Sequence, residues 1–297
     1  MIKSENYDYT HLSKALFKLK EEYPFLKICD IGKSVKGKDI RAVKIGAAGE
    51  SVLFAAAFHG SEHITTNIAL FFLEDLAKSI KEEKELCGID IKRILAKKSI
   101  IIIPRVNPDG CDISILGQRA CPDKAKTVSN LCKGDFTKWN SNLKGVDINH
   151  NFDADWEALR EKEIKMGIYG PSPTRYGGKS PESEPETKAI TTLCRNTNIS
   201  HALALHSQGE VIYHGYKNHH PSKSRRMAEI FATASGYALD VPIGIAEGGG
   251  FKDWFILEFN RPAFTVEVGK GKNPLPIETA EEIYKKIKKM LVIAAGM

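Results

Sequence analysis

Two short segments that lie far apart in the chain carry residue types that bind metal ions. The first is His59-Gly60-Ser61-Glu62, which directly follows the apolar run 51–58 and precedes a helical pattern. The second is His206, which follows the strand-like segment 201–205. In an open α/β sheet, ligands bind where strands end. Two imidazoles and one carboxylate with an open fourth position form a common catalytic zinc set. We therefore predict that His59, Glu62 and His206 bind one zinc ion.

The H-x-x-E spacing alone is weak evidence, because a chain with nine histidines and 37 acidic residues produces it by chance. The alternative is an exposed loop histidine beside a glutamate that the helix dipole favours. The position of His59 at one strand end, matched by His206 at another, favours the metal site. His63 follows Glu62 directly and is expected to point away from that site.

A hydrolytic zinc site also needs a group that takes a proton from water and returns it. Glu267 is the single acidic residue in the strand-like segment 264–268. A carboxylate on a buried strand is costly unless it is paired or functional. Glu267 is therefore the candidate general base and acid, and a structural ion pair at a strand end is the alternative.

The elements that must position these residues alternate between short apolar segments and longer segments of helical period, which indicates an α/β fold. Strands are predicted at residues 25–32, 39–46, 51–58, 99–104, 201–206 and 263–268. Helices are predicted from about residue 62, from 185, at about 222–234 and near the C-terminus. Because the ligands and the base must share one site, we predict one domain, residues 1–297, with a core at about 25–295.

Two segments are predicted to be loops. Residues 111–144 are polar and poorly periodic, which indicates a long loop with room for a short helix. Loops of that length inside compact domains are usually functional. Residues 167–180 are rich in Gly and Pro and end where a helix begins. At that helix start, Ser183 is predicted to be the cap and Glu186 to complete a capping box.

The composition is that of a globular protein, with 42% hydrophobic and 27% charged residues among 297. The net charge of +6 is a mild excess; it fits an acidic small substrate and forms no tract of the kind that binds nucleic acid. No apolar run approaches the roughly 20 residues that span a bilayer, and residues 1–23 show no signal peptide. We expect a cytoplasmic protein without membrane insertion. Of its cysteines, Cys29, Cys87 and Cys194 are predicted to be buried thiols.

Further motifs accompany these residues in a fixed order: His59-Gly60-Ser61-Glu62, Asn107-Pro108-Asp109-Gly110, Gly145-Val146-Asp147-Ile148-Asn149, Tyr176-Gly177-Gly178, Ser183-Glu184-Pro185-Glu186, His206-Ser207 and Phe264-Thr265-Val266-Glu267. Together they resemble the zinc carboxypeptidase family, the carboxypeptidase A-like metallopeptidases, from about residue 25 to the C-terminus. The resemblance implies a single-domain fold with a mixed, mostly parallel central sheet flanked by helices. It also implies one zinc ion held by His59, Glu62 and His206, with Glu267 as the catalytic base.

Other segments point to one branch of that family: His206-Ser207-Gln208-Gly209-Glu210, Gly249-Gly250-Phe251-Lys252-Asp253-Trp254-Phe255, Arg261-Pro262-Ala263-Phe264 and residues 268–276. They are similar to the bacterial γ-D-glutamyl-L-diamino acid endopeptidases. The resemblance implies hydrolysis of the γ-D-glutamyl–diaminopimelate bond in peptidoglycan stem peptides. The expected partner is an acidic muropeptide or small peptide. Wall-binding repeats, which often accompany such enzymes, are not seen in this sequence.

Three positions depart from the family pattern. His150 stands where the family's exopeptidases carry an arginine that binds the terminal carboxylate of the substrate, and Ile256 replaces a tyrosine. Asn140 stands where a basic residue polarises the scissile carbonyl, and we predict that it donates a neutral hydrogen bond there. Lys138 and Lys144 are the alternative donors.

The resemblance also suggests residues for substrate binding. Asn149 and His150 are predicted to orient a substrate carboxylate, and Glu210 to contact the amino group of diaminopimelate. Two other functions stay open: a metallocarboxypeptidase of broader specificity that releases C-terminal residues, and a peptide-binding homologue that turns over poorly. A cytoplasmic enzyme would meet wall material by recycling imported fragments, or by release on lysis or sporulation. The sequence leaves the oligomeric state open.

Overall fold

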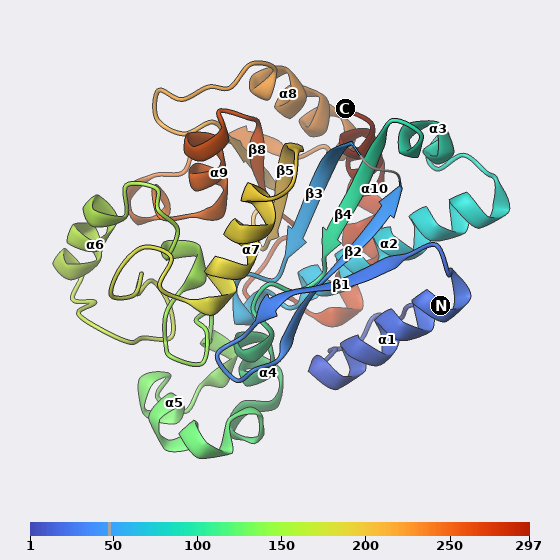
Figure 1. Cartoon of the computed structure of the whole chain (residues 1–297). Helices are drawn as coiled ribbons and strands as arrows, with labels where there is room; N and C mark the ends of the chain where they lie inside the picture. The colour runs from blue at the N-terminus through green and yellow to red at the C-terminus, as the bar shows by residue number, and fades with distance from the viewer. Residues whose placement is uncertain (47–48) are drawn as a thin grey trace.

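The structure is a computed structural model that describes residues 1–46 and 49–297. At its centre, the described residues form one mixed eight-stranded sheet in the order β1-β2-β4-β3-β5-β8-β6-β7 (Figure 1). The strands are β1 (Lys27–Lys33), β2 (Asp39–Gly46), β3 (Glu50–Ala56), β4 (Lys98–Ile103), β5 (Ile199–His206), β6 (Val211–His214), β7 (Ala238–Asp240) and β8 (Ala263–Glu267).

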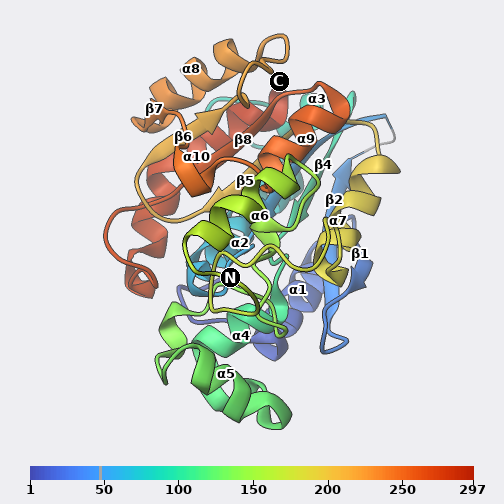
Figure 2. The ribbon, with the colours of Figure 1, turned by 90° about the vertical axis from the view of Figure 1, so that its left-hand side faces the viewer.

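Helices cover both faces of this sheet. They are α1 (Tyr9–Glu22), α2 (Ile64–Glu82), α3 (Ile91–Leu95), α4 (Pro108–Leu116), α5 (Ala125–Leu131), α6 (Trp156–Lys165), α7 (Pro185–Arg195), α8 (Ser224–Ser235), α9 (Phe251–Phe259) and α10 (Ala280–Gly296). Helices α1, α2, α8 and α10 pack on one face, and α7 and α9 on the other. In the view at right angles, α10 and α7 lie on opposite sides of the central strands (Figure 2). None of the described helices is long and apolar enough to cross a membrane.

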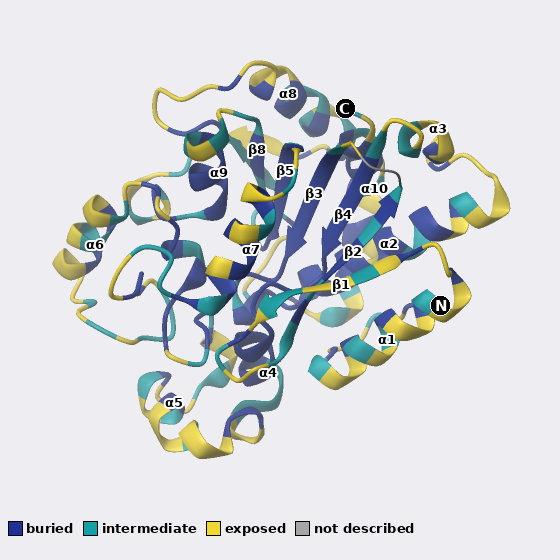
Figure 3. Cartoon of the chain, viewed as in Figure 1, coloured by how far each residue is buried: buried dark blue, intermediate teal, exposed yellow. Residues whose placement is uncertain are grey.

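The central strands are apolar because both of their faces are covered. In β3, Val52 and Phe54 pack toward α2 and α10, whereas Leu53 and Ala55 pack toward α7 and α9. Side chains alternate along a strand, so a strand between two helical layers needs an apolar residue at every position. Figure 3 shows β3, β4 and β5 buried along most of their length. The continuous apolar runs of the sequence are therefore the middle of the sheet.

The order of the strands positions the predicted site residues. Strand β5 lies between β3 and β8, and both of its pairings are parallel. The carboxyl ends of these three strands therefore lie at the same edge of the sheet. His206 of β5 is paired in register with Glu267 of β8, and His59 follows shortly after β3. The mixed, mostly parallel sheet expected from the sequence is confirmed.

Residues 111–144, predicted as a long loop with room for a short helix, are more helical than expected. Helices α4 and α5 lie in this region, where Ile113 and Val128 pack with Trp139 in a small apolar cluster. These helices are too short to produce a clear period in the sequence. The prediction of buried thiols holds for Cys194 and fails for Cys29 and Cys87. Cys29 is exposed because β1 is an edge strand of the sheet.

The predicted capping box at the start of α7 is also wrong, although the helix does begin at Pro185. Its N-cap position is Glu184, and the hydroxyl of Ser183 donates to the side chain of Glu184. The Glu186 carboxylate instead accepts hydrogen bonds from the Val35 N–H at 3.0 Å and the Asn142 side chain at 3.0 Å. Glu186 therefore joins α7 to two distant loops.

This buried carboxyl supports a prediction on stability. Burial raises the pKa of Glu186 to about 7, although hydrogen bonds from Asn142 and Val35 act to lower it. The ordinary pKa of this carboxyl is 4.5. As the pH rises, the unfolded chain therefore loses the proton at a lower pH than the folded protein does. The contribution of the protonated Glu186 carboxyl to the stability of the folded protein is complete below about pH 4.5 and is lost as the pH rises through about 7. Over this pH range the free energy of unfolding falls by about 3 kcal/mol because of this group.

We expect Glu186→Gln to remove this dependence on pH. Urea unfolding of both proteins at pH 5 and pH 8 measures it, and the unfolding free energy of the wild type should fall relative to the variant as the pH rises. Parallel changes in the two proteins would contradict the assignment.

Candidate active site

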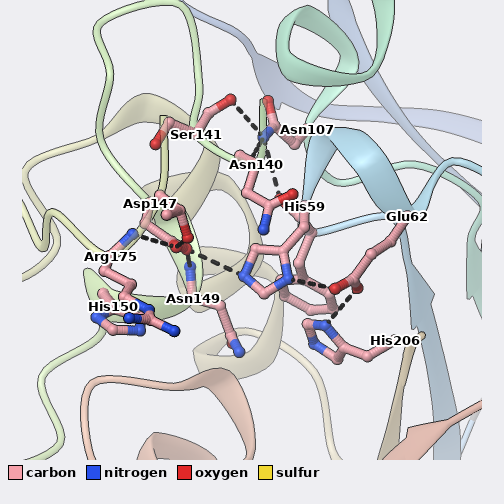
Figure 4. A network of polar contacts seen from close by, with 12 residues as sticks. His59, Glu62, Asn107, Asn140, Ser141, Asp147, Asn149, His150, Arg175 and His206 are labelled. Atoms are coloured by element: carbon pink, nitrogen blue, oxygen red, sulfur yellow. Dashed lines mark hydrogen bonds and ion pairs between the residues drawn. The ribbon is translucent and has the colours of Figure 1, made fainter. Parts of the chain in front are cut away.

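The three predicted metal ligands meet at the carboxyl edge of the sheet (Figure 4). Nδ1 of His59 lies 2.9 Å from Oε1 of Glu62, and Nδ1 of His206 lies 2.9 Å from Oε2 of the same carboxylate. One ligand atom from each residue lies within 4.8 Å of the others. Both Nδ1 atoms thus face one carboxylate, and the three side chains form a group that could bind a metal ion. His63 is not part of this group.

Close approach of the backbone brings these side chains together. A Cβ atom at Gly60 would lie only 2.4 Å from the carbonyl oxygen of Gly110, so a larger residue would push the two segments apart. The amide of Asn107 donates to the carbonyls of Phe58 at 3.0 Å and Asn140 at 3.1 Å. Through these hydrogen bonds, the Asn107-Pro108-Asp109-Gly110 motif links the segment that follows β3 to the loop that carries Asn140.

Asp147 holds the ring of His59 from the other side. Nε2 of His59 lies 3.1 Å from Oδ1 of Asp147, whose side chain is buried. Burial lowers the pKa of His59, but the carboxylates of Glu62 and Asp147 outweigh this effect and raise it well above its ordinary value. A carboxylate on the distal nitrogen of a metal-binding histidine fixes the ring and leaves the other nitrogen free for the ion. The sequence motif contained Asp147 but did not indicate this contact.

Glu267 projects from β8 next to the metal-binding group. Burial and the negative charge of Glu62 raise the pKa of Glu267 well above its ordinary value. Its carboxylate forms neither a hydrogen bond nor an ion pair with the residues that the structure describes. The structural ion pair considered as an alternative is therefore not seen in the described chain.

A pocket of about 120 Å³ opens beside Glu267. It is lined by Asn149, His150, Tyr213, Pro242, Ala246, Gly248, Gly250, Lys252, Asp253 and Thr265 together with Glu267. Lys252 and Asp253 form an ion pair there, with side chains only 5% and 4% exposed. The Lys252 ammonium also donates to the carbonyl of Gly215 at 2.7 Å. Sequence reasoning assigned no role to this pair, because nothing in the local pattern shows that the two charges are buried.

Asn140 lies beside the metal-binding group. Its side-chain oxygen accepts a hydrogen bond from the hydroxyl of Ser61, which leaves its amide nitrogen to donate. Its backbone carbonyl accepts from the N–H of Gly60 at 3.1 Å. Asn140 is thus placed where it could polarise a carbonyl, and that role stays a prediction.

The three residues predicted to bind substrate differ in their surroundings. Asn149 and His150 line the pocket, and Nδ1 of His150 lies 2.8 Å from the buried carboxylate of Glu163. Glu210 does not line the pocket; its carboxylate forms ion pairs with Lys270 at 3.1 Å and Lys286 at 2.6 Å. A contact between Glu210 and an amino group would have to replace these lysines, and it stays a prediction.

Comparison with known proteins agrees with this geometry. A family profile described as zinc carboxypeptidase matches residues 12–291. The chain belongs to the zinc carboxypeptidase family. Among its relatives, γ-D-glutamyl-L-diamino acid endopeptidase 1 of Lysinibacillus sphaericus is 37% identical over 284 residues, which cover 95% of this chain and 70% of that protein. Uncharacterized protein YqgT of Bacillus subtilis is 33% identical over 94% of this chain and 74% of its own length.

The fold of this zinc carboxypeptidase is also found in solved structures. Bovine thrombin-activatable fibrinolysis inhibitor, in its complex with tick carboxypeptidase inhibitor, superposes with a TM-score of 0.75 at 20% identity and covers 98% of this chain and 97% of that chain. The protein is a metallopeptidase of a zinc-dependent family, and its group of two imidazole nitrogens and one carboxylate fits zinc.

The contact between Asp147 and His59 gives a prediction for zinc affinity. Asp147→Asn should weaken zinc binding about 10- to 100-fold, because the neutral amide holds the ring less firmly and makes it a weaker ligand. Competition with a chromogenic chelator measures the affinity. Asp153→Asn, at an exposed position nearby, is the control. Unchanged affinity in Asp147→Asn would show that this carboxylate does not support a metal ligand.

Proposed function

We propose that this zinc carboxypeptidase hydrolyses the γ-D-glutamyl–diaminopimelate amide bond of peptidoglycan stem peptides. In this proposal His59, Glu62 and His206 hold one zinc ion, and Glu267 is the general base. The name of the relative from Lysinibacillus sphaericus supports the substrate class, since that protein is a γ-D-glutamyl-L-diamino acid endopeptidase. The cytoplasmic location stays a prediction.

The charge distribution in the pocket carries the proposal. Diaminopimelate bears an amine and a carboxylate at the far end of its side chain. The pocket beside Glu267 offers the opposite charges, because Lys252 and Asp253 line it and are buried. An ammonium group has three N–H donors, and Lys252 uses two of them on Gly215 and Asp253. The third can bind the substrate carboxylate, and Asp253 can bind the amine.

The positions of the side chains support the following reaction. When bound, zinc acts as a Lewis acid that polarises the scissile carbonyl and lowers the pKa of water. The Glu267 carboxylate takes the proton of the attacking water and then delivers it to the leaving amine. The amide nitrogen of Asn140 donates a hydrogen bond to the oxygen of the attacked carbonyl.

The decisive experiment uses the zinc-loaded protein and L-Ala-γ-D-Glu-diaminopimelate. Release of free diaminopimelate, followed by mass spectrometry, is the expected result. An α-linked peptide with a C-terminal leucine tests the broader carboxypeptidase. Release of leucine at a similar rate would contradict the proposal, and tight binding without cleavage of either peptide would favour the non-catalytic homologue.

The role of Lys252 gives a second test. A stem peptide with lysine in place of diaminopimelate lacks only the side-chain carboxylate. The wild type should prefer the diaminopimelate peptide, and Lys252→Met should reduce that preference about 10- to 100-fold, which is the effect of losing a charge-assisted hydrogen bond. Ratios of kcat/KM for the two peptides measure it, with the exposed Lys285→Met as control. An unchanged ratio in Lys252→Met would exclude this contact.

A further inference from the structure

Arg175 lies in the loop between α6 and α7, and its backbone is linked to His59 of the metal-binding group through hydrogen bonds to Asp147. Its φ of 68° lies in the left-handed region that residues other than glycine seldom adopt. In this conformation its N–H donates to Oδ2 of Asp147 at 2.8 Å. Oδ1 of the same carboxylate contacts Nε2 of His59 at 3.1 Å. Two hydrogen bonds therefore set the position of Arg175 relative to a zinc ligand.

The side chain of Arg175 is exposed, and its guanidinium has no hydrogen-bond or ion-pair partner in the part of the chain that the structure describes. Figure 4 shows this guanidinium next to the ring of His150. The electrostatics agree with this placement. Burial lowers the pKa of His150, and the charges of His59 and Arg175 lower it further, against the opposite effect of Asp147.

The acidic groups around Arg175 already have other partners. Asp147 accepts the backbone N–H of Arg175 itself. Glu163 is buried, contacts Nδ1 of His150 at 2.8 Å and pairs with the guanidinium of Arg160. The imidazole of His150 therefore has one nitrogen left for a ligand, whereas the guanidinium of Arg175 keeps the planar set of donors that binds a carboxylate at two points.

We propose that Arg175 is a substrate-binding residue that binds the α-carboxylate of the residue released by the reaction, next to His150, which lines the pocket together with Asn149. This inference rests on the proposed function, which places the released diaminopimelate residue in that pocket. An α-carboxylate is free there only when the residue ends its peptide. Arg175 thus selects stem peptides that end at diaminopimelate over longer ones.

The test compares L-Ala-γ-D-Glu-diaminopimelate with the same peptide whose α-carboxylate is converted to an amide. For the zinc-loaded wild type, amidation should raise KM about 10- to 100-fold with a much smaller change in kcat. For Arg175→Met, the two peptides should have equal KM values. Arg175→Lys should restore part of the difference in KM between the two peptides, because lysine supplies the positive charge but not the planar pair of N–H donors. Arg93→Met, at an exposed position on α3, is the matched control.

A calorimetric titration separates this inference from the proposed function. The two peptides are titrated into zinc-loaded Glu267→Gln, with and without Arg175→Met, so that binding is measured without turnover. If the wild type cleaves neither peptide but the free acid binds through Arg175, the proposed function fails and the role of Arg175 stands. Equal binding of acid and amide, absence of binding by both, or an unchanged preference in Arg175→Met would overturn the role of Arg175.

Discussion

Glu267→Gln is expected to lower kcat about 10²- to 10⁴-fold while the protein still binds one zinc ion. The amide has nearly the same shape as the carboxylate but does not take a proton from water. No described residue forms an ion pair with Glu267, so the change breaks no structural contact in the described chain. It also removes a carboxyl whose pKa is raised by burial and by the charge of Glu62, so we expect the fold to be retained.

Kinetics with the diaminopimelate tripeptide and zinc content by mass spectrometry measure the two effects separately. Glu278→Gln replaces an exposed glutamate and should leave both unchanged. Full activity in Glu267→Gln would exclude Glu267 as the base. Loss of zinc together with activity would indicate that this carboxylate supports the metal site instead.

His206→Ala is expected to weaken zinc binding by more than the roughly 10- to 100-fold that loss of a ligand's hydrogen-bonding partner costs. The variant keeps only Glu62 and His59 of the three ligands, and Nδ1 of His206 is one of the two nitrogens that face the Glu62 carboxylate. Activity at limiting zinc should fall in parallel.

Equilibrium dialysis against a competing chelator measures the affinity, and circular dichroism shows whether the fold is kept. His219→Ala, at an exposed histidine, should bind zinc like the wild type. In the wild type, a strong chelator should remove activity and added zinc should restore it. Binding of one zinc ion by His206→Ala with wild-type affinity would mean that the ion lies elsewhere.

The sequence was sufficient to predict the residues that follow strands. Continuous apolar runs identified β3, β4 and β5, because a strand covered on both faces has no polar side. The parallel order then brings the residues after those strands to one edge. His59, Glu62 and His206 could be predicted for this reason, since polar residues that follow a buried strand stand out against their neighbours. Glu267 could be predicted because it is the single acidic residue within the strand-like segment 264–268.

The tertiary structure alone decided which side chains assist them. The contact of Asp147 with His59 spans 88 residues, and the burial of Lys252 with Asp253 depends on packing around Gly215 and Tyr216. The sequence led us to assign a substrate carboxylate to His150, whereas the fold sets Arg175 beside it and turns Nδ1 of His150 toward Glu163. Periodicity and spacing describe neighbours along one strand or helix. The direction of a loop side chain, and the charges it meets, are set by contacts between distant segments that form only when the chain packs.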